Sequence, residues 1–155
     1  MKFVEIFTDG ACSGNPGKGG YGAILKYNGN VKEISQGYLI TTNNRMELLA
    51  AITALEMLKE PCKVDLYSDS KYLVDSVTLG WIEKWQANGW KRKGSEMAKN
   101  IDLLKRLLTQ LSRHEVKFIW VKGHDGHTEN ERCDYLATSA IKKDNLIEDV
   151  GYDGN

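Results

Sequence analysis

The chain has 155 residues, is 41% hydrophobic and carries 21 basic and 21 acidic side chains, so its formal net charge is zero. This size predicts a single domain with a sizeable hydrophobic core. Because overall charge points to no polyanion, a surface that binds nucleic acid must arise from local clustering of basic residues. The sequence has no run of eighteen apolar residues and no charged leader before an apolar stretch, so we expect neither a membrane span nor secretion.

The cysteines indicate a reducing compartment. Cys12, Cys62 and Cys133 are odd in number and widely spaced, which argues against a disulfide framework. We therefore expect a cytoplasmic protein.

Residues 3–10 predict a strand at the centre of a sheet. Aromatic and β-branched residues occupy both of its faces, at Phe3, Val4, Ile6 and Phe7. The predicted strand ends at Asp9, and Gly10 lets the backbone turn. A carboxylate at the end of a central strand is costly unless it is hydrated, paired or bound to a metal.

Two more strands are expected after a glycine-rich segment. Residues 11–20 lack the Gly-Lys-Thr/Ser ending of a phosphate-binding loop, so we interpret them as a wide hairpin connection. Their exposed amides, beside Asp9, could approach a phosphate or a sugar. Residues 21–27 and 31–40 predict strands joined by a turn at Asn28-Gly29-Asn30.

A helix is expected from residues 41–44 to about Lys59, where Pro61 ends it. Its apolar stripe consists of Leu48, Ile52, Leu55 and Leu58. The strand over 64–68 follows a helical crossover, so it should lie parallel to the first strand, and it ends at Asp69. Beyond it we predict helical structure over 72–111 interrupted at Gly80, Gly89 and Gly94, a fifth strand over 116–121, a loop over 122–127 and a helix over 129–143.

The predicted fold is therefore α/β, in one domain over residues 1–143. The remaining residues, 144–155, form an acidic tail that we expect to be partly mobile. Sites in α/β sheets form outside the carboxyl ends of parallel strands, so Asp9 and Asp69 should be neighbours. Asp69 has an alternative role as the cap of a helix that begins near Ser70.

Two further acids point inward. Asn44 and Glu47 have the spacing of a capping box, but the side of the helix that carries Glu47 continues with alanines and borders the apolar stripe. Asp134 likewise shares a helix side with Ala137, and the capping box of its helix is better formed by Thr128 and Glu131. Both acids should therefore lean toward the sheet.

Four inward acids, Asp9, Glu47, Asp69 and Asp134, would repel one another without a cation. All-oxygen ligands favour Mg²⁺ or Mn²⁺, and a carboxylate cluster with two such ions is typical of in-line displacement at phosphorus. A zinc site made of His124, His127 and Cys133 is a weaker alternative, since no second cysteine lies nearby. A two-carboxylate glycosidase, which needs no divalent ion, is another.

Tryptophan and basic residues alternate in one later segment. They are Trp81, Lys84, Trp85, Trp90, Lys91, Arg92, Lys93 and Lys99. Trp81 and Trp85 have the spacing of residues that pack on a core, whereas the cluster 91–93 suits contact with a phosphate backbone. His124 lies in a glycine-flanked loop, where it is either an exposed bystander or a group that moves a proton or helps product to leave.

Several motifs together resemble type 1 ribonuclease H, in its bacterial ribonuclease HI form, from about Lys2 to Tyr152. They are Thr8-Asp9-Gly10, Thr42-Asn43-Asn44-Arg45-Met46-Glu47-Leu48, Ser68-Asp69-Ser70, and Val121-Lys122-Gly123-His124 followed by Asn130-Glu131-Arg132-Cys133-Asp134. The resemblance implies the ribonuclease H fold, a five-stranded mixed sheet of three antiparallel and then two parallel strands with helices on both faces. It also implies a monomer that cleaves the RNA strand of an RNA–DNA hybrid, leaving 5′-phosphate and 3′-hydroxyl ends.

The resemblance assigns roles by position. The acids Asp9, Glu47, Asp69 and Asp134 would bind Mg²⁺, with Mn²⁺ as a substitute, and His124 would be the mobile catalytic histidine. The hybrid would be contacted by Gly10, Ala11, Cys12, Asn15, Asn43 and Asn44 around the cut, by Thr42 and Asn100 at a DNA phosphate, and by Trp81, Lys84, Trp85 and Lys91 on the basic protrusion. Reading RNA in a hybrid requires recognition of shape and of the 2′-hydroxyl.

Two departures from the family pattern concern affinity. Gln86, Ala87 and Asn88 stand where bacterial relatives carry basic residues, and Glu83 lies close by. Ile40 replaces a basic residue before the threonine pair. A non-catalytic hybrid-binding module of the same fold, and a transposase- or resolvase-like nuclease, remain alternatives.

Overall fold

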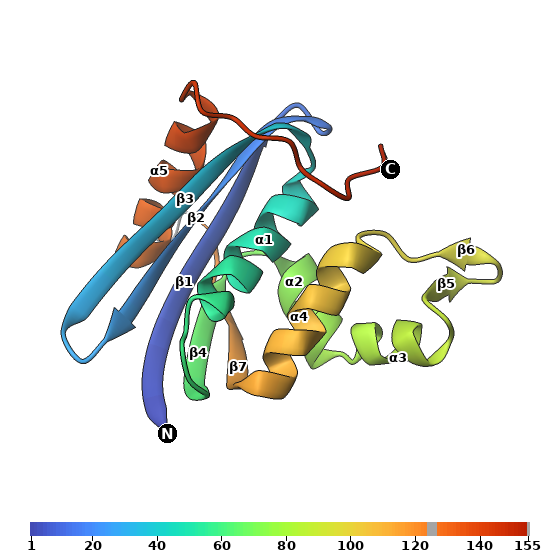
Figure 1. The fold of residues 1–155 in the computed structure, drawn as a ribbon, viewed down its shortest axis with the longest axis horizontal. Coiled ribbons are helices and arrows are strands. Elements are labelled where there is room, and N and C mark those ends of the chain that lie inside the picture. Colours follow the sequence, from blue (N-terminus) through green and yellow to red (C-terminus); the bar gives the residue numbers. More distant parts are fainter. Residues whose placement is uncertain (124–126, 155) are drawn as a thin grey trace.

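The computed structural model describes residues 1–123 and 127–154. Its centre is a five-stranded sheet with the order β3-β2-β1-β4-β7 (Figure 1). The first three strands in the chain are antiparallel and the last two run parallel to β1, which confirms the predicted fold class. The strands are β1 (Lys2–Ser13), β2 (Gly17–Tyr27), β3 (Asn30–Thr41), β4 (Cys62–Ser68) and β7 (Glu115–Trp120).

Helices cover both faces of this sheet. On one face α5 packs on β2, β1 and β3, and on the other α1 packs on β1 and β2, with α4 outside it (Figure 1). Because α1 lies between the sheet and α4, it is buried on nearly every side, well beyond the single apolar stripe that the sequence predicts. The helices are α1 (Asn43–Glu56), α2 (Lys71–Thr78), α3 (Trp81–Ala87), α4 (Ile101–Arg113) and α5 (Thr128–Ile141). None of them is long and apolar enough, in the described residues, to cross a membrane.

The glycine-rich segment is mostly strand, not the wide connection that was predicted. The pairing of β1 with β2 extends to Ser13 opposite Lys18, and only the short turn over 14–16 separates the two strands. Glycines carry no alternating side chains, so the period that identifies a strand is absent from this part of the sequence. The turn predicted at Asn28-Gly29 is confirmed, with φ of 49° and 85° at these two residues.

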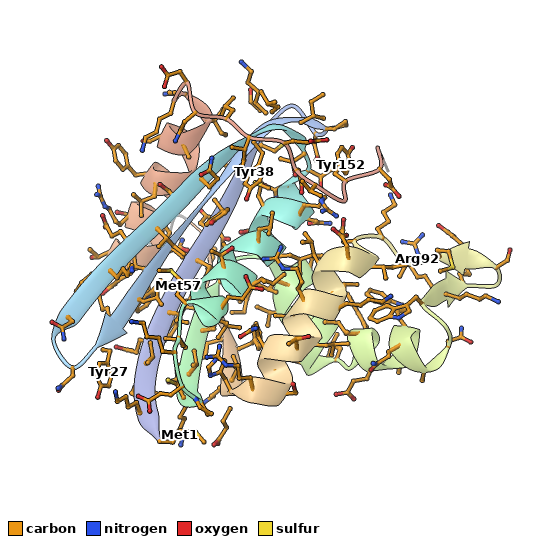
Figure 2. All side chains as sticks on the ribbon, viewed as in Figure 1. Met1, Tyr27, Tyr38, Met57, Arg92 and Tyr152 are labelled. Carbon is orange, nitrogen blue, oxygen red and sulfur yellow. The ribbon has the colours of Figure 1, made fainter. Side chains whose placement is uncertain are left out.

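A second correction concerns the segment predicted as helical over 72–111. Between α3 and α4 the chain forms a two-stranded hairpin of β5 (Lys91–Lys93) and β6 (Glu96–Met97). Strands of three and two residues are too short to show a period, and Gly89 and Gly94, with φ of 65° and 58°, turn the backbone on either side of β5. With α3 the hairpin forms an arm that extends away from the sheet, and Arg92 lies on it (Figure 2).

The observed helix caps differ from the predicted capping boxes. Thr42 caps α1 by accepting from the Arg45 amide, so Asn44 and Glu47 already lie inside the helix. Similarly His127, and not Thr128, caps α5. The cap is set by the residue at which the chain leaves its extended conformation, which residue spacing does not reveal.

The described tail residues, 144–154, follow the edge of the sheet and reach the start of α1 (Figure 1). The Leu39 amide donates to the Ile147 carbonyl at 2.9 Å, and the Ile147 amide donates to Gly37 at 3.1 Å. Further on, Asp149 is buried against Arg45. Tyr152 lies above the start of α1 (Figure 2).

Candidate active site

Three acids from three elements meet at one end of the parallel strands. Each of Asp9, Glu47 and Asp69 offers a carboxylate oxygen, and these oxygens lie within 4.8 Å of one another. Asp69 directly follows β4, as predicted. Asp9, in contrast, lies inside β1 and pairs with Gly22, because β1 continues beside β2 after its pairing with β4 has ended at Thr8.

Glu47 reaches this point because α1 crosses close over β1. A Cβ atom at Gly10 would lie 2.7 Å from the Glu47 amide nitrogen and 2.8 Å from the Met46 carbonyl carbon. Glycine is therefore required here for the approach of two backbones, and not for the turn that the sequence suggested. The Glu47 side chain is buried, and its Oε1 has no hydrogen-bond partner among the described residues.

Asp69 is free of the structural role considered for it. The N-cap of α2 is Ser70, whose Oγ accepts from the Leu73 amide at 3.2 Å. Asp134, half-buried on α5, lines the same hollow, whose volume is about 400 Å³. The hollow is lined by Asp9, Gly10, Asn43, Asn44, Glu47, Asp69, Ser70, Lys71, Tyr72 and Asp134.

The electrostatics of the acids favour a cation as their ligand. Burial, together with the negative charges of Asp69 and Asp134, raises the pKa of Asp9 to about 8. Burial and the charges of Asp9 and Asp69 raise the pKa of Glu47 well above its usual value. Carboxyl groups with these shifts, and an unpartnered buried oxygen, fit a hard divalent cation, which would satisfy the oxygen and allow the acids to ionise.

The residues expected around the cut lie beside this cluster. Asn43 and Asn44 begin α1 and line the hollow, and Asn15 accepts at its Oδ1 from the Asn43 amide at 3.1 Å. Ala11 and Cys12 lie half-buried on β1, just beyond Gly10. Backbone and side-chain amide groups are thus available beside the acids.

A second hollow adjoins the first and shares Asn44 and Tyr72 with it. Its volume is about 460 Å³, and Asn44, Tyr72, Trp81, Trp85, Arg92, Lys99 and Asn100 line it. Asn100 is oriented by two hydrogen bonds: Arg45 donates to its Oδ1 at 3.4 Å, and its Nδ2 donates to the Tyr72 hydroxyl at 3.1 Å. Thr42 and Asn100, which were predicted to bind one phosphate, line a further hollow of about 200 Å³ together with Lys99.

Comparison with known proteins decides the family. The RNase H family model matches residues 1–142. The ribonuclease H of Rippkaea orientalis is 59% identical over 152 residues, covering 98% of this chain and 93% of that protein. The chain belongs to the ribonuclease H family. The ribonuclease H of Desulforamulus reducens is 58% identical over 150 residues, covering 97% of this chain and 94% of that protein.

A solved structure of the ribonuclease H family agrees with this fold. LC9-RNase H1, described as a type 1 RNase H, superposes with a TM-score of 0.81 at 31% identity, over 92% of this chain and 73% of that chain. The predicted resemblance to bacterial type 1 ribonuclease H is thus confirmed.

Some family positions lie apart from the two hollows. Lys84 on α3 and Lys91 on β5 are exposed on the arm and line neither of them. Trp81 and Trp85 line the second hollow with their rings 6.2 Å apart, and Trp85 also packs on the core. His124 lies outside the described residues.

The zinc alternative finds no support in Cys133. Its thiol is buried and donates to the Phe7 carbonyl at 3.2 Å, and burial raises its pKa, so the thiol stays protonated. A cysteine binds zinc as a thiolate. Two residues that the sequence analysis missed, Lys71 and Tyr72, line the acidic hollow; their position directly after Ser68-Asp69-Ser70 was the available signal.

Proposed function

We infer that this chain is an endonuclease that hydrolyses the RNA strand of RNA–DNA hybrids. The observation that carries this function is the convergence of three carboxylates within 4.8 Å in a chain of the ribonuclease H family. Each acid comes from a different element, and the unpartnered oxygen of Glu47 has no structural purpose among the described residues. A module that only bound the hybrid would have no use for so costly a cluster.

The acids fit divalent metal ions, on which the family depends. We propose that Asp9, Glu47, Asp69 and Asp134 hold two ions, with Mg²⁺ as the natural metal and Mn²⁺ as a substitute. When bound, such ions supply a Lewis acid for the phosphoryl oxygens and a hydroxide-like nucleophile at neutral pH. The chain itself contributes the ionised carboxylates, and Asp9 and Glu47 must lose their protons for the site to load.

The hybrid is held by groups on both sides of the acids. We propose that backbone groups of Gly10, Ala11 and Cys12 and the side chains of Asn15, Asn43 and Asn44 contact the RNA strand, where 2′-hydroxyl groups distinguish it from DNA. Thr42 and Asn100 bind a phosphate of the DNA strand. Support for this comes from their common hollow with Lys99, whose charge suits a phosphate.

The arm supplies the more distant contacts. Trp81 and Trp85 line an open hollow in which a sugar or base would meet apolar ring surface, while Lys84 and Lys91 offer exposed charge. We propose that His124, which follows β7 and precedes α5 in sequence, transfers a proton to the leaving group or assists release of the product. Cleavage then leaves 5′-phosphate and 3′-hydroxyl ends.

We propose further that the protein acts as a cytoplasmic monomer. The free cysteines support a reducing compartment, and the four acids that would hold the metal all come from one chain.

The decisive experiment is cleavage of a labelled RNA–DNA hybrid with Mg²⁺, beside single-stranded RNA, duplex RNA and duplex DNA. We expect cutting of the RNA strand of the hybrid alone, lost on chelation and lost in Asp9→Asn. If the hybrid is bound but not cut, the chain is a non-catalytic module. If duplex DNA is cut equally well, the substrate assignment is wrong and a transposase-like nuclease takes its place.

A further inference from the structure

Lys71 lies among the acids without being paired to any of them. It is the first residue of α2 and lines the hollow that contains Asp9, Glu47, Asp69 and Asp134. In the described part of the chain it is the one cationic side chain in this lining, and no ion pair between it and a carboxylate is found there. Its charge is therefore available to a ligand that enters the hollow.

Trp120 fixes the place of this lysine. The Lys71 ammonium lies over the indole ring, 5.0 Å from its centroid. Trp120 is the last residue of β7 and pairs with Ser68, and its indole N–H donates to the Asp69 backbone carbonyl at 3.2 Å. The ring is thus tied to the segment that carries Asp69. Its 43% exposure shows that core packing does not account for it.

The charges in the hollow suit Lys71 for binding a phosphate. Ionised carboxylates repel the phosphates of a nucleic acid, and a cationic side chain beside them offsets part of this repulsion. A lysine acts as a compact point charge for a phosphate, and one whose stem is already held on an aromatic ring loses less side-chain entropy on binding.

We propose that Lys71 binds a backbone phosphate of the RNA strand next to the scissile bond, and that Trp120 is the positioning residue for its ammonium group. This inference rests on the proposed function, because it takes the strand in the acidic hollow to be RNA. The contact is to a phosphate and not to a base, so it strengthens binding equally for all hybrid sequences.

The test compares Lys71→Gln with Lys71→Arg and with Lys63→Gln, the last as a control. Lys63 is an exposed lysine near the start of β4, at the opposite end of the strand that leads to Asp69, and its loss changes net charge equally. Hybrid binding is measured with Mg²⁺ from about 50 to 200 mM salt in an Asp9→Asn background, which does not cut. We expect Lys71→Gln to weaken binding about fivefold at low salt and to lower the slope of log K against log salt by about 0.7–1.

Lys71→Arg should retain the affinity, and Lys63→Gln should match the parent within about twofold. In the otherwise native enzyme, Lys71→Gln should raise KM by the same factor and leave kcat within about twofold, as expected for loss of uniform binding. The inference is overturned if Lys71→Gln binds as Lys63→Gln does at every salt concentration. It is also overturned if Lys71→Gln lowers kcat alone.

The role of Trp120 is tested by a double-mutant cycle. Trp120→Leu should weaken hybrid binding. Trp120→Phe should largely retain it, because an aromatic ring remains under the ammonium group. In a Lys71→Gln background, Trp120→Leu should weaken binding no further. Additive losses would show that Trp120 acts apart from Lys71. If the native chain does not cut the hybrid, the proposed function itself fails. If it cuts the hybrid but the Lys71 variants bind it as Lys63→Gln does, only the inference about Lys71 fails.

Discussion

At the scale of single residues, the carboxylate of Asp9 that is proposed to bind metal destabilises the metal-free fold when it ionises. The residue is 5% exposed, and its carboxyl group is affected by the negative charges of Asp69 and Asp134. Its pKa is about 8 in the folded chain against an ordinary value of 3.8, so the folded state binds this proton more tightly than the unfolded state does. Without metal, stability from this group is therefore lost as the pH rises from about 4 to 8.

We predict that Asp9→Asn stabilises the metal-free protein, and increasingly so between pH 5 and pH 8. Asparagine keeps the acceptor that Asp9 Oδ1 offers to the Gly10 amide at 2.9 Å but carries no charge. The difference in unfolding free energy should grow by up to about 1.4 kcal/mol per pH unit. Urea unfolding in EDTA at pH 5 and pH 8 measures it.

Two controls frame this measurement. Asp144→Asn, at an exposed acid of the tail, should show no such trend with pH. Saturating Mg²⁺ should abolish or reverse the advantage of Asp9→Asn, because an ion that binds only the folded native site stabilises it. If Asp9→Asn differs from the native chain by the same unfolding free energy at both pH values, the pKa of Asp9 is not raised by burial and by its acidic neighbours.

At the scale of elements, the approach of α5 to the sheet depends on glycines in β2 and β3. A Cβ atom at Gly22 would lie 2.6 Å from the Cys133 carbonyl oxygen and 3.1 Å from the Ala137 amide nitrogen. Gly22 also pairs with Asp9, so the glycine that admits α5 lies beside the first acid of the site. Close contact of α5 with β2 is what brings Asp134 near Asp9.

Gly22→Ala should therefore impair both stability and catalysis. We expect a loss of about 1–3 kcal/mol in unfolding free energy, as for other overpacked sites, and a fall in kcat as α5 moves away with Asp134. Thermal unfolding and hybrid cleavage measure the two effects. If Asp134 acts through this approach, Asp134→Asn should cost less activity in Gly22→Ala than in the native chain. Native stability and turnover in Gly22→Ala would contradict the argument.

The small number of free cations on the arm predicts that hybrid binding is weak and depends little on salt. The end of α3 carries the exposed, uncharged residues Gln86, Ala87 and Asn88, and Arg92 on β5 is paired with Glu96 at 2.5 Å. Fewer free cations mean fewer released counterions on binding. Replacing Gln86 and Asn88 with lysine should tighten hybrid binding and steepen its salt dependence by up to about two units of slope, while kcat stays unchanged. Binding across salt concentrations that matched the parent would refute this.

The elements that the sequence predicts well are those with a local cause. The strand β1 is apolar on both faces, and β4 alternates buried residues such as Val64 and Leu66 with more exposed ones. The turn at Asn28-Gly29 needs the left-handed backbone that these residues adopt easily. In contrast, the hairpin β5–β6 is too short for any period. The N-caps of α1 and α5 could not be predicted, because each is set by the residue at which the chain leaves its extended conformation. The four acids could be named from the sequence, but the burial of Glu47 follows from the close crossing of α1 over β1 at Gly10, which no local pattern reveals.

At the scale of the whole molecule, one ion-pair network joins the C-terminal tail to the starts of α1 and α4. Arg45, which is 1% exposed, donates from Nε to Asp149 at 2.7 Å and from two guanidinium nitrogens to Asp102 at 2.9 and 2.7 Å. Thr41 donates to the same Asp149 carboxylate at 2.7 Å. The partners lie 104 residues apart in sequence, so no local pattern could reveal that the tail closes over α1.

This network also reaches the site. Arg45 lies between Asn44 and Met46 at the start of α1 and donates to Asn100, which lines the hollow expected to bind a DNA phosphate. A change in the tail should therefore alter substrate binding as well as stability, although no tail residue lines the acidic hollow in the described structure.

We predict that Asp149→Ala lowers the unfolding free energy by about 3–5 kcal/mol, because it leaves a buried guanidinium with only the more exposed carboxylate of Asp102. Glu148→Ala, at the exposed neighbouring position, should change stability by less than about 0.5 kcal/mol. Urea unfolding at pH 7 measures both.

The same two variants separate a structural from a positioning effect. At a temperature where both remain folded, Asp149→Ala should raise KM for the hybrid while kcat changes little, because Arg45 no longer holds Asn100 in one orientation and the acids are untouched. Asn100→Ala should then raise KM in the native chain but add little in Asp149→Ala. If Asp149→Ala is destabilised and yet binds the hybrid with native affinity, the tail stabilises α1 without contributing to recognition of the substrate.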